Sequence, residues 1–159
     1  MIIQSKKAFS MITAIFVIVI MATVTALIMN VTGKTIKETT QQYQKEQAML
    51  LARSYTEQAL MYALHYDRQA NGNCINDINA TFGDGVSSQI YTIETRLRYI
   101  SNDTQLPLAC NIIERWQDDG TAGFNATVSV IIDVYVHYQD FDDALNRPIT
   151  YHRRTLQKL

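Results

Sequence analysis

The sequence predicts an α+β fold in which one long N-terminal helix packs on a small antiparallel β-sheet. The first observation is an uncharged apolar run close to the N-terminus. The second is a helix-forming stretch, free of proline and glycine, a few residues further on. The third is a C-terminal part with several runs in which apolar and polar residues alternate, as in half-buried strands. The part beyond the apolar run is long enough for one small domain.

The apolar run extends from Ala8 to Met29 and follows Lys6 and Lys7. About 20 apolar residues suffice for a helix to cross a bilayer, and such a segment must satisfy its own backbone hydrogen bonds. The two lysines place the N-terminus in the cytoplasm and the rest of the chain outside it. The few hydroxyl side chains would bond either to carbonyls one turn earlier or to neighbouring helices; they belong to Ser10, Thr13, Thr23 and Thr25.

The stretch from Lys34 to Tyr66 predicts that this helix continues outward and becomes amphipathic. It is rich in Gln, Glu, Lys, Ala and Leu, which favour helix. Apolar side chains recur with the spacing of one helix face, at Ala48, Leu51, Ala52, Tyr55, Ala59, Tyr62, Ala63 and Tyr66. We expect this face to pack on the globular domain. A membrane-anchored coiled coil would need a sustained heptad, which the stretch lacks.

The remaining chain predicts a loop and then an antiparallel sheet. Residues Asp67 to Gln89 are dominated by Asn, Gly, Asp and Ser and predict a loop. Four strands are expected at 90–100, 109–117, 126–138 and 149–156. Alternation in the first strand predicts four inward residues, Tyr91, Ile93, Leu97 and Tyr99. In the third strand, five residues share one face: Val128, Val130, Ile132, Val134 and Val136. Short connections favour antiparallel pairing.

Two cysteines, Cys74 and Cys110, are the only ones in the chain. An even count outside the cytoplasm favours one disulfide between them, and two buried thiols are the alternative. No histidine or further cysteine stands at metal-ligand spacing from either.

Nothing in the sequence indicates catalysis, and we expect neither an enzyme nor a cofactor. His65, His137 and His152 lie far apart and in no recognisable motif. The acidic group of Asp140, Asp142 and Asp143 offers oxygen ligands for Ca²⁺. Its spacing matches no EF-hand, and a solvated loop explains it equally well, so no metal site is predicted.

Two surface features suggest modification or nucleic-acid binding. Four Asn-x-Thr triplets occur, but only Asn79 follows an acidic residue, Asp77, two positions earlier, as the extended bacterial N-glycosylation acceptor requires. We expect Asn79 to be exposed in the predicted loop, where it is either a glycosylation site or unmodified. The chain also has two arginine pairs, Arg96 with Arg98 and Arg153 with Arg154.

If the strands carrying these arginine pairs adjoin, they would form a basic patch for DNA phosphates. The simpler interpretation is that they solvate an exposed sheet face opposite Glu94 and Asp133. All fifteen acidic residues follow the apolar run, so the exterior part is mildly acidic and nucleic-acid binding has no support from composition.

The residues KKAFSMITAIFVIVIMA resemble the class III signal of type IV pilins and type II secretion pseudopilins. The resemblance implies that prepilin peptidase cuts between Ala8 and Phe9 and that Phe9 is then N-methylated. The family usually has Gly before the cut, where this chain has the rarer Ala8. It also has Glu at the fifth mature position, where Thr13 stands here, and a missing Glu is associated with minor, tip-located subunits.

The resemblance therefore implies a minor pilin-like or pseudopilin subunit of a type IV pilus, competence or type II secretion system. Its organisation would be a leader at 1–8, a transmembrane helix at 9–30, an amphipathic continuation at 31–66 and a globular domain at 67–159. Expected partners are other pilin or pseudopilin subunits, prepilin peptidase and the cytoplasmic membrane. The C-terminal domain would lie in the periplasm or at the cell surface.

Two other interpretations of the N-terminus remain open. In a Sec-exported soluble protein, Val24 and Ala26 would form a small-residue cleavage site. In an uncleaved single-pass anchor, the membrane helix would display a periplasmic binding domain. The three interpretations predict different mature N-termini: Phe9 for the pilin-like subunit, Leu27 for the exported protein and Met1 for the anchor.

Overall fold

The computed structural model describes the backbone of residues 5–84, 90–102, 106–116, 128–140 and 147–159, and the side chains of these residues except 5–10, 102, 115 and 116. The chain forms two compact units, Met1–Tyr43 and Gln44–Leu159. Helix α1 (Ser5–His65) runs through both, as predicted, and Gly33 does not interrupt it. Every core residue of the described chain belongs to the second unit, so packing begins at Gln44.

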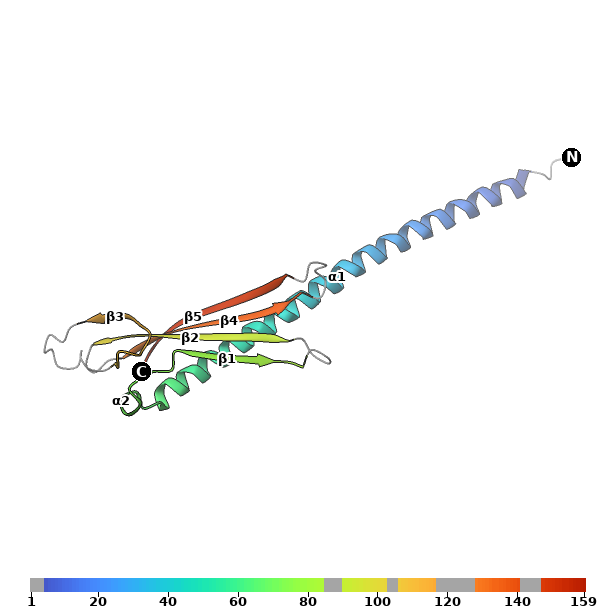
Figure 1. Cartoon of the computed structure of the whole chain (residues 1–159). Coiled ribbons are helices and arrows are strands. Elements are labelled where there is room, and N and C mark those ends of the chain that lie inside the picture. The colour runs from blue at the N-terminus through green and yellow to red at the C-terminus, as the bar shows by residue number, and fades with distance from the viewer. Residues whose placement is uncertain (1–4, 85–89, 103–105, 117–127, 141–146) are drawn as a thin grey trace. The chain divides into compact units, whose positions relative to one another are not determined.

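In the second unit, α1 covers one face of a five-stranded sheet (Figure 1). The strands are β1 (Asp77–Phe82), β2 (Tyr91–Asn102), β3 (Ile112–Trp116), β4 (Ser129–Gln139) and β5 (Pro148–Lys158). Their order is β1-β2-β4-β5, with antiparallel neighbours throughout, and β3 pairs with the last part of β2. This architecture confirms the predicted fold class.

The layer between helix and sheet combines small helix side chains with large sheet side chains. Four alanines of α1 are fully or almost fully buried, and Thr56 is buried among them; the alanines are Ala48, Ala52, Ala59 and Ala63. The sheet contributes the predicted inward residues of β2 and, from β4 and the residue before it, the alternate positions Val128 to Tyr138, all buried. The prediction that Tyr62 belongs to the packed helix face is wrong, because this residue is 43% exposed.

The segment predicted as a loop, 67–89, contains regular structure and corrects that prediction. A short helix α2 (Arg68–Asn71) begins at Asp67, whose carboxylate accepts a hydrogen bond from the Ala70 amide at 3.0 Å, and ends at Gly72 with φ 64°. Such a left-handed conformation favours glycine. Strand β1 then pairs antiparallel with β2 over six residue pairs.

The pairing of β3 also differs from the prediction, because it is parallel to β2. Strands β1 and β3 use the same edge of β2: β1 lies opposite Tyr91 to Arg96, and β3 lies opposite Tyr99 to Asn102. The two strands start near each other and run in opposite directions along this edge. A disulfide joins the segments that lead into them, between Cys74 and Cys110, with 4.9 Å between the Cα atoms. The predicted disulfide is therefore present.

Candidate functional site

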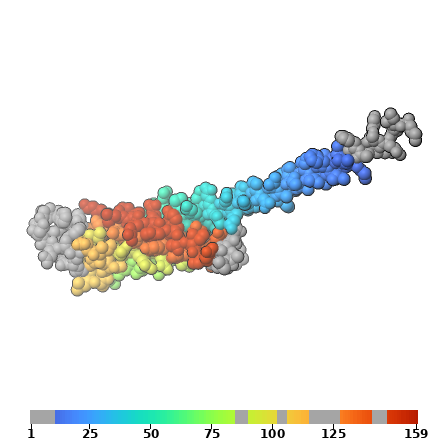
Figure 2. Space-filling view, turned by 90° about the horizontal axis from the view of Figure 1, so that it is seen from above, coloured from blue at the N-terminus to red at the C-terminus, as the bar shows by residue number. Residues whose placement is uncertain are grey.

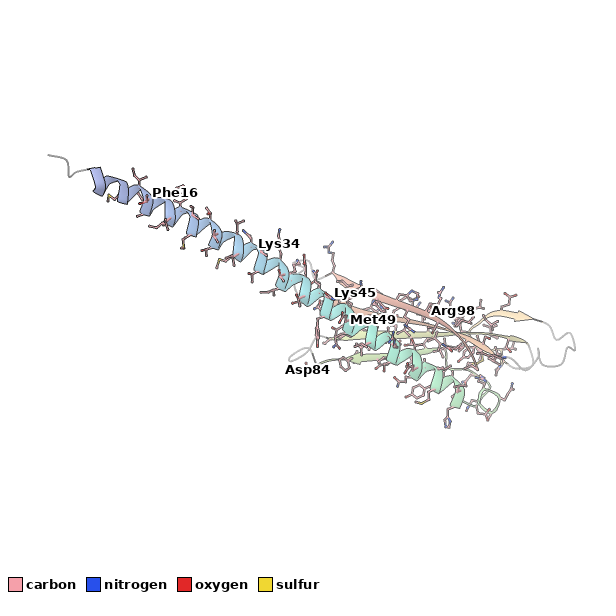
Figure 3. All side chains as sticks on the ribbon, turned by 180° about the vertical axis from the view of Figure 1, so that it is seen from behind. Phe16, Lys34, Lys45, Met49, Asp84 and Arg98 are labelled. Atoms are coloured by element: carbon pink, nitrogen blue, oxygen red, sulfur yellow. A yellow bond between two sulfur atoms is a disulfide. The ribbon has the colours of Figure 1, made fainter. Side chains whose placement is uncertain are left out.

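The first unit contains one helix long and apolar enough to cross a membrane. From Met11 to Val31 its side chains are all exposed, and Figure 2 shows this segment in blue. Phe16, which is 65% exposed, is labelled on it in Figure 3. The first charged side chain after this run is that of Lys34. Exposed aliphatic and aromatic groups on all sides of a helix indicate surroundings less polar than water.

Hydroxyl groups along this helix bond to its own backbone. The Oγ1 atoms of Thr23 and Thr25 donate to the carbonyls of Ile20 and Met21, each at 2.8 Å. Further along, four more threonines donate in the same way, at 2.8–3.0 Å; they are Thr32, Thr35, Thr39 and Thr40. For Thr23 and Thr25 this confirms the first of the two predicted arrangements, and it lowers the cost of placing a hydroxyl in lipid.

The expected cleavage position, Ala8 and Phe9, falls within α1, which begins at Ser5. The side chains of both residues lie outside the described part of the chain. Thr13 lies on α1 in the exposed apolar segment. The backbone around the cleavage position is thus helical.

The sheet face opposite α1 is open and polar, and its side chains form rows across the strands. One row contains Arg154, Asp133, Arg96 and Asp77, from β5 to β1. The next row contains His152, Tyr135, Glu94 and Asn79. Because alternate residues of a strand share a face, this face brings together several of the polar residues considered as candidates, Asn79, His152 and Arg154 among them.

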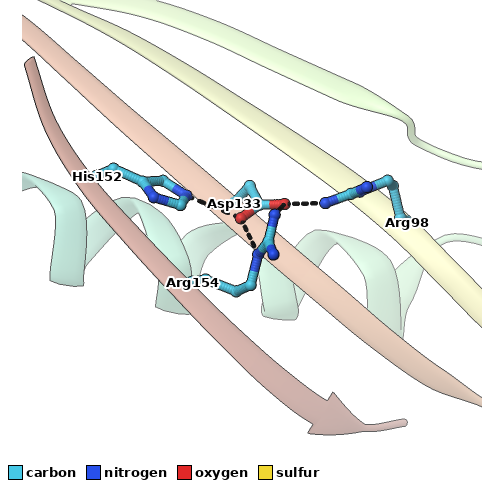
Figure 4. A network of polar contacts seen from close by, with 4 residues as sticks. All are labelled: Arg98, Asp133, His152 and Arg154. Atoms are coloured by element: carbon cyan, nitrogen blue, oxygen red, sulfur yellow. Dashed lines mark hydrogen bonds and ion pairs between the residues drawn. The ribbon is translucent and has the colours of Figure 1, made fainter.

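Asp133 is the centre of this open face, although its carboxylate is only 1% exposed. Arg154 donates to it through Nε at 2.6 Å and Nη2 at 3.1 Å. Arg98 donates through Nη2 at 2.5 Å, and Nε2 of His152 lies 2.9 Å from the other oxygen (Figure 4). Each carboxylate oxygen therefore has two nitrogen partners, which satisfies a charge that would otherwise be costly to bury.

These contacts set the protonation of the cluster. Burial alone would raise the pKa of Asp133, but hydrogen bonds from Arg154, Arg98 and His152, together with the charge of Arg154, outweigh it and hold the pKa of Asp133 well below its ordinary value. The hydrogen bond and charge of Asp133 in turn raise the pKa of Arg154. Asp133 is thus a permanent anion at physiological pH.

Planar groups stack beside the cluster. The rings of Tyr135 and His152 are parallel, with centroids 4.4 Å apart, and the Arg96 guanidinium carbon lies 5.4 Å from the Tyr135 centroid. Arg96 also pairs with Glu94 at 3.3 Å, with both side chains well exposed. His137, the neighbour in the following row, lies 2.8 Å from the Thr150 hydroxyl. These contacts hold the planar side chains of the open face in place.

The arrangement does not bring the two arginine pairs into one patch. Strand β4 separates β2 from β5. Arg154 lies on the open face, whereas Arg153, one residue earlier, lies on the helix side. Arg98 and Arg154, one from each pair, both donate to Asp133. The face thus matches the simpler interpretation, arginines balanced by acidic neighbours.

The other candidate residues are dispersed. Asp140 is buried after β4, and Asp142 and Asp143 lie outside the described residues. Within the described part of the chain, no group of three His, Cys, Asp or Glu residues could hold a metal ion. His65 ends α1 and is exposed.

Asn79 is exposed, as expected, but on strand β1 instead of in a loop.

Comparison of the chain with protein-family models, with curated proteins and with solved structures found no match.

Proposed function

We propose that this protein is a minor pilin-like or pseudopilin subunit, cut between Ala8 and Phe9 by prepilin peptidase, N-methylated at Phe9 and assembled through its N-terminal helix. The observation that carries the proposal is the division of α1. From Met11 to Met29 it exposes only apolar and hydroxyl side chains, and from Gln44 onward one side of it is buried against a sheet. A signal peptide or a plain anchor does not require this continuity with the folded domain.

The exposed apolar part of α1 requires surroundings less polar than water. Its large side chains from Met11 to Met29 are 46–75% exposed. At roughly 25 cal/mol per Å² of apolar surface, leaving such a helix in water is strongly unfavourable. Lipid and the equivalent helices of other subunits both supply apolar surroundings, and a pilin-like subunit uses them in succession. In this proposal the domain beyond Gln44 is displayed in the periplasm or at the cell surface.

Processing is tested by mass spectrometry of the mature N-terminus, on protein from native membranes with and without prepilin peptidase. We expect an N-methylated Phe9 that depends on the peptidase and is lost in Ala8→Asp, which places a charge at the cut. Ala26→Leu is the matched control, because it removes the small-residue site of a Sec signal and keeps the apolar run uncharged. A chain that begins at Leu27 or at Met1 would overturn the proposal.

Assembly is tested by cysteine substitution along one stretch of the exposed helix, from Phe16 to Val24, one residue at a time. The native cysteines are joined to each other and leave the new thiol as the reactive one. Packing against other subunits predicts cross-linking to them that peaks every three to four residues, the period of a helix face. Uniformly weak cross-linking would indicate a helix surrounded by lipid alone and would refute assembly through this segment.

A further inference from the structure

Strand β1 presents three residues of an acceptor motif on one exposed face. Side chains alternate along a strand, so Asp77, Asn79 and Thr81 share a side, and all three are exposed. Ile78 and Ala80 lie between them, half-buried and packed against the core. The strand therefore displays the acidic residue, the asparagine and the hydroxyl together.

The position of β1 in the sheet leaves this face accessible. Among the described strands, β1 pairs only with β2 and is an edge strand. Asn79 lies opposite Glu94 in the register, and neither residue is buried. Within the described part of the chain, no hydrogen bond ties down the Asn79 side chain. Its amide nitrogen can thus be approached from the open face and from the strand edge.

Other Asn-x-Thr triplets of the chain differ from this one. Asn30 lies in the apolar part of α1, where its Nδ2 donates to the Ala26 carbonyl at 3.3 Å and Thr32 bonds back to Ile28. Asn102 and Asn125 have Ile100 and Gly123 two positions earlier, in place of an acid. These three triplets serve as internal controls for the one at Asn79.

We infer that Asn79 is the acceptor of an N-linked glycan, attached by an oligosaccharyltransferase that requires an acidic residue two positions before the asparagine. The inference rests on the proposed placement of this domain outside the cytoplasm. The donor is an oligosaccharide on a polyprenyl diphosphate. The Asn79 Nδ2 bonds to the anomeric carbon, the bond from that carbon to the diphosphate oxygen breaks, and Nδ2 loses one proton as the polyprenyl diphosphate leaves.

A glycan at this position would also protect the sheet. An edge strand exposes unpaired N–H and C=O groups and can pair with strands of other molecules. A bulky hydrophilic group at the middle of β1 blocks such pairing. Ala80 and Ile78 remain in the core, so attachment requires no change in packing.

The test is glycopeptide mass spectrometry on the full chain, produced in bacteria that contain such a transferase and its lipid-linked glycan. A flexible Asp-x-Asn-x-Thr peptide fused after Leu159 reports whether the C-terminal domain reaches the enzyme. We expect the glycan on Asn79 and on the fused peptide. The Asn79 glycan should disappear in Asn79→Gln and Thr81→Ala, persist in Thr81→Ser, and fall strongly in Asp77→Asn but not in Asp77→Glu.

A glycosylated fused peptide with unmodified Asn79 would overturn the inference, as would modification that is indifferent to Asp77. If neither site is modified, the domain does not reach the enzyme, and both the placement and the inference fail. The N-terminal peptide from the same digest keeps the two proposals separate. Methylated Phe9 with bare Asn79 refutes only the glycan, and glycosylated Asn79 on a chain that begins at Met1 refutes only the processing.

Discussion

Reduction of the disulfide between Cys74 and Cys110 should lower stability without changing the fold. The bridge spans 36 sequence positions, and the loop-closure relation then gives about 4 kcal/mol at room temperature, mainly through the unfolded chain. The folded state should persist because hydrogen bonds already hold the two segments together. Asn76 Nδ2 donates to the Ala109 carbonyl at 3.3 Å, and the Asn111 amide donates to Asn76 Oδ1 at 2.9 Å.

These two segments are also fixed to strand β2. The Leu97 amide donates to the Asn76 carbonyl at 2.7 Å, and the Tyr99 amide donates to the Asn111 carbonyl at 2.8 Å. The Tyr99 hydroxyl donates to the Ile75 carbonyl at 2.8 Å. None of these bonds involves the sulfur atoms, so reduction should leave the native contacts in place and act on the unfolded ensemble.

The measurement is denaturant unfolding of the fragment Gln44–Leu159, monitored by far-UV circular dichroism with and without reductant. This fragment contains every core residue of the described chain. We expect the free energy of unfolding to fall by about 4 kcal/mol and the denaturant slope to rise, since an open chain exposes more surface. The double variant Cys74→Ala/Cys110→Ala is the control and should not respond to reductant. A change below about 1 kcal/mol, or loss of native secondary structure before any denaturant is added, would refute this reasoning.

Substitutions in the buried layer, on the open face and at Tyr99 should have distinct signatures in the same assay. Ala52→Leu should cost about 1–3 kcal/mol, since a fully buried position has no room for added atoms, whereas Ser54→Leu on the exposed face should cost under about 0.5 kcal/mol. Asp133→Asn should cost about 1–3 kcal/mol at neutral pH, a range reduced because its arginine partners are partly exposed. The lowered pKa of Asp133 means that this cost should shrink below about pH 4, and the exposed control Glu94→Gln should show neither effect. Burial raises the pKa of Tyr99 from 10.0 to about 12, so its contribution is complete below pH 10 and is lost as pH rises toward 12, at up to about 1.4 kcal/mol per pH unit. The variant Tyr99→Phe should lack that slope, and an unchanged slope would contradict the assignment.

Strong periodicity made much of this fold predictable from the sequence. In β2, and in β4 with the preceding Val128, apolar residues alternate over many positions, and all nine predicted inward residues are buried. Four alanines of the amphipathic part of α1 follow a helix period and are buried as expected; they are Ala48, Ala52, Ala59 and Ala63. Tyr62 was misassigned because a large side chain at the border of a helix face can turn toward solvent, while the small Thr56 occupies the buried stripe.

The errors fall where local sequence carries little information. Strand β1 has the sequence DINATF, whose Asp and Asn residues disfavour strands. It forms because β2 offers an unpaired edge, a tertiary effect that no local pattern records. The parallel direction of β3 has a similar origin. Its entry point is fixed by the bond between the Tyr99 amide and the Asn111 carbonyl and by the nearby disulfide, and β1 already occupies the other part of the edge.

Burial of Asp133 was equally hidden from sequence reasoning. Alternation places it on the outward face of β4, where a carboxylate is normally solvated. Its burial arises from Arg98 on β2 and from His152 and Arg154 on β5, which meet only when β4 lies between those strands. The pattern Arg-x-Arg on one strand and His-x-Arg on another could have suggested cross-strand partners, but only with the strand order known.

Two exposed surfaces in the described part of the chain, the open sheet face and the apolar segment of α1, differ in whether their side chains have interaction partners. On the open sheet face, cations and anions meet one another, and Asp133 has its full set of partners. Such a face is stable in water without a further partner. The exposed segment of α1 is the opposite case. The hydroxyls of Thr23 and Thr25 bond to the helix backbone, and the large apolar side chains, Phe16 among them, are exposed within the described part of the chain. Burying these side chains would remove apolar surface from water and stabilise the protein further, which supports the proposal that the protein acts by inserting and assembling its helix.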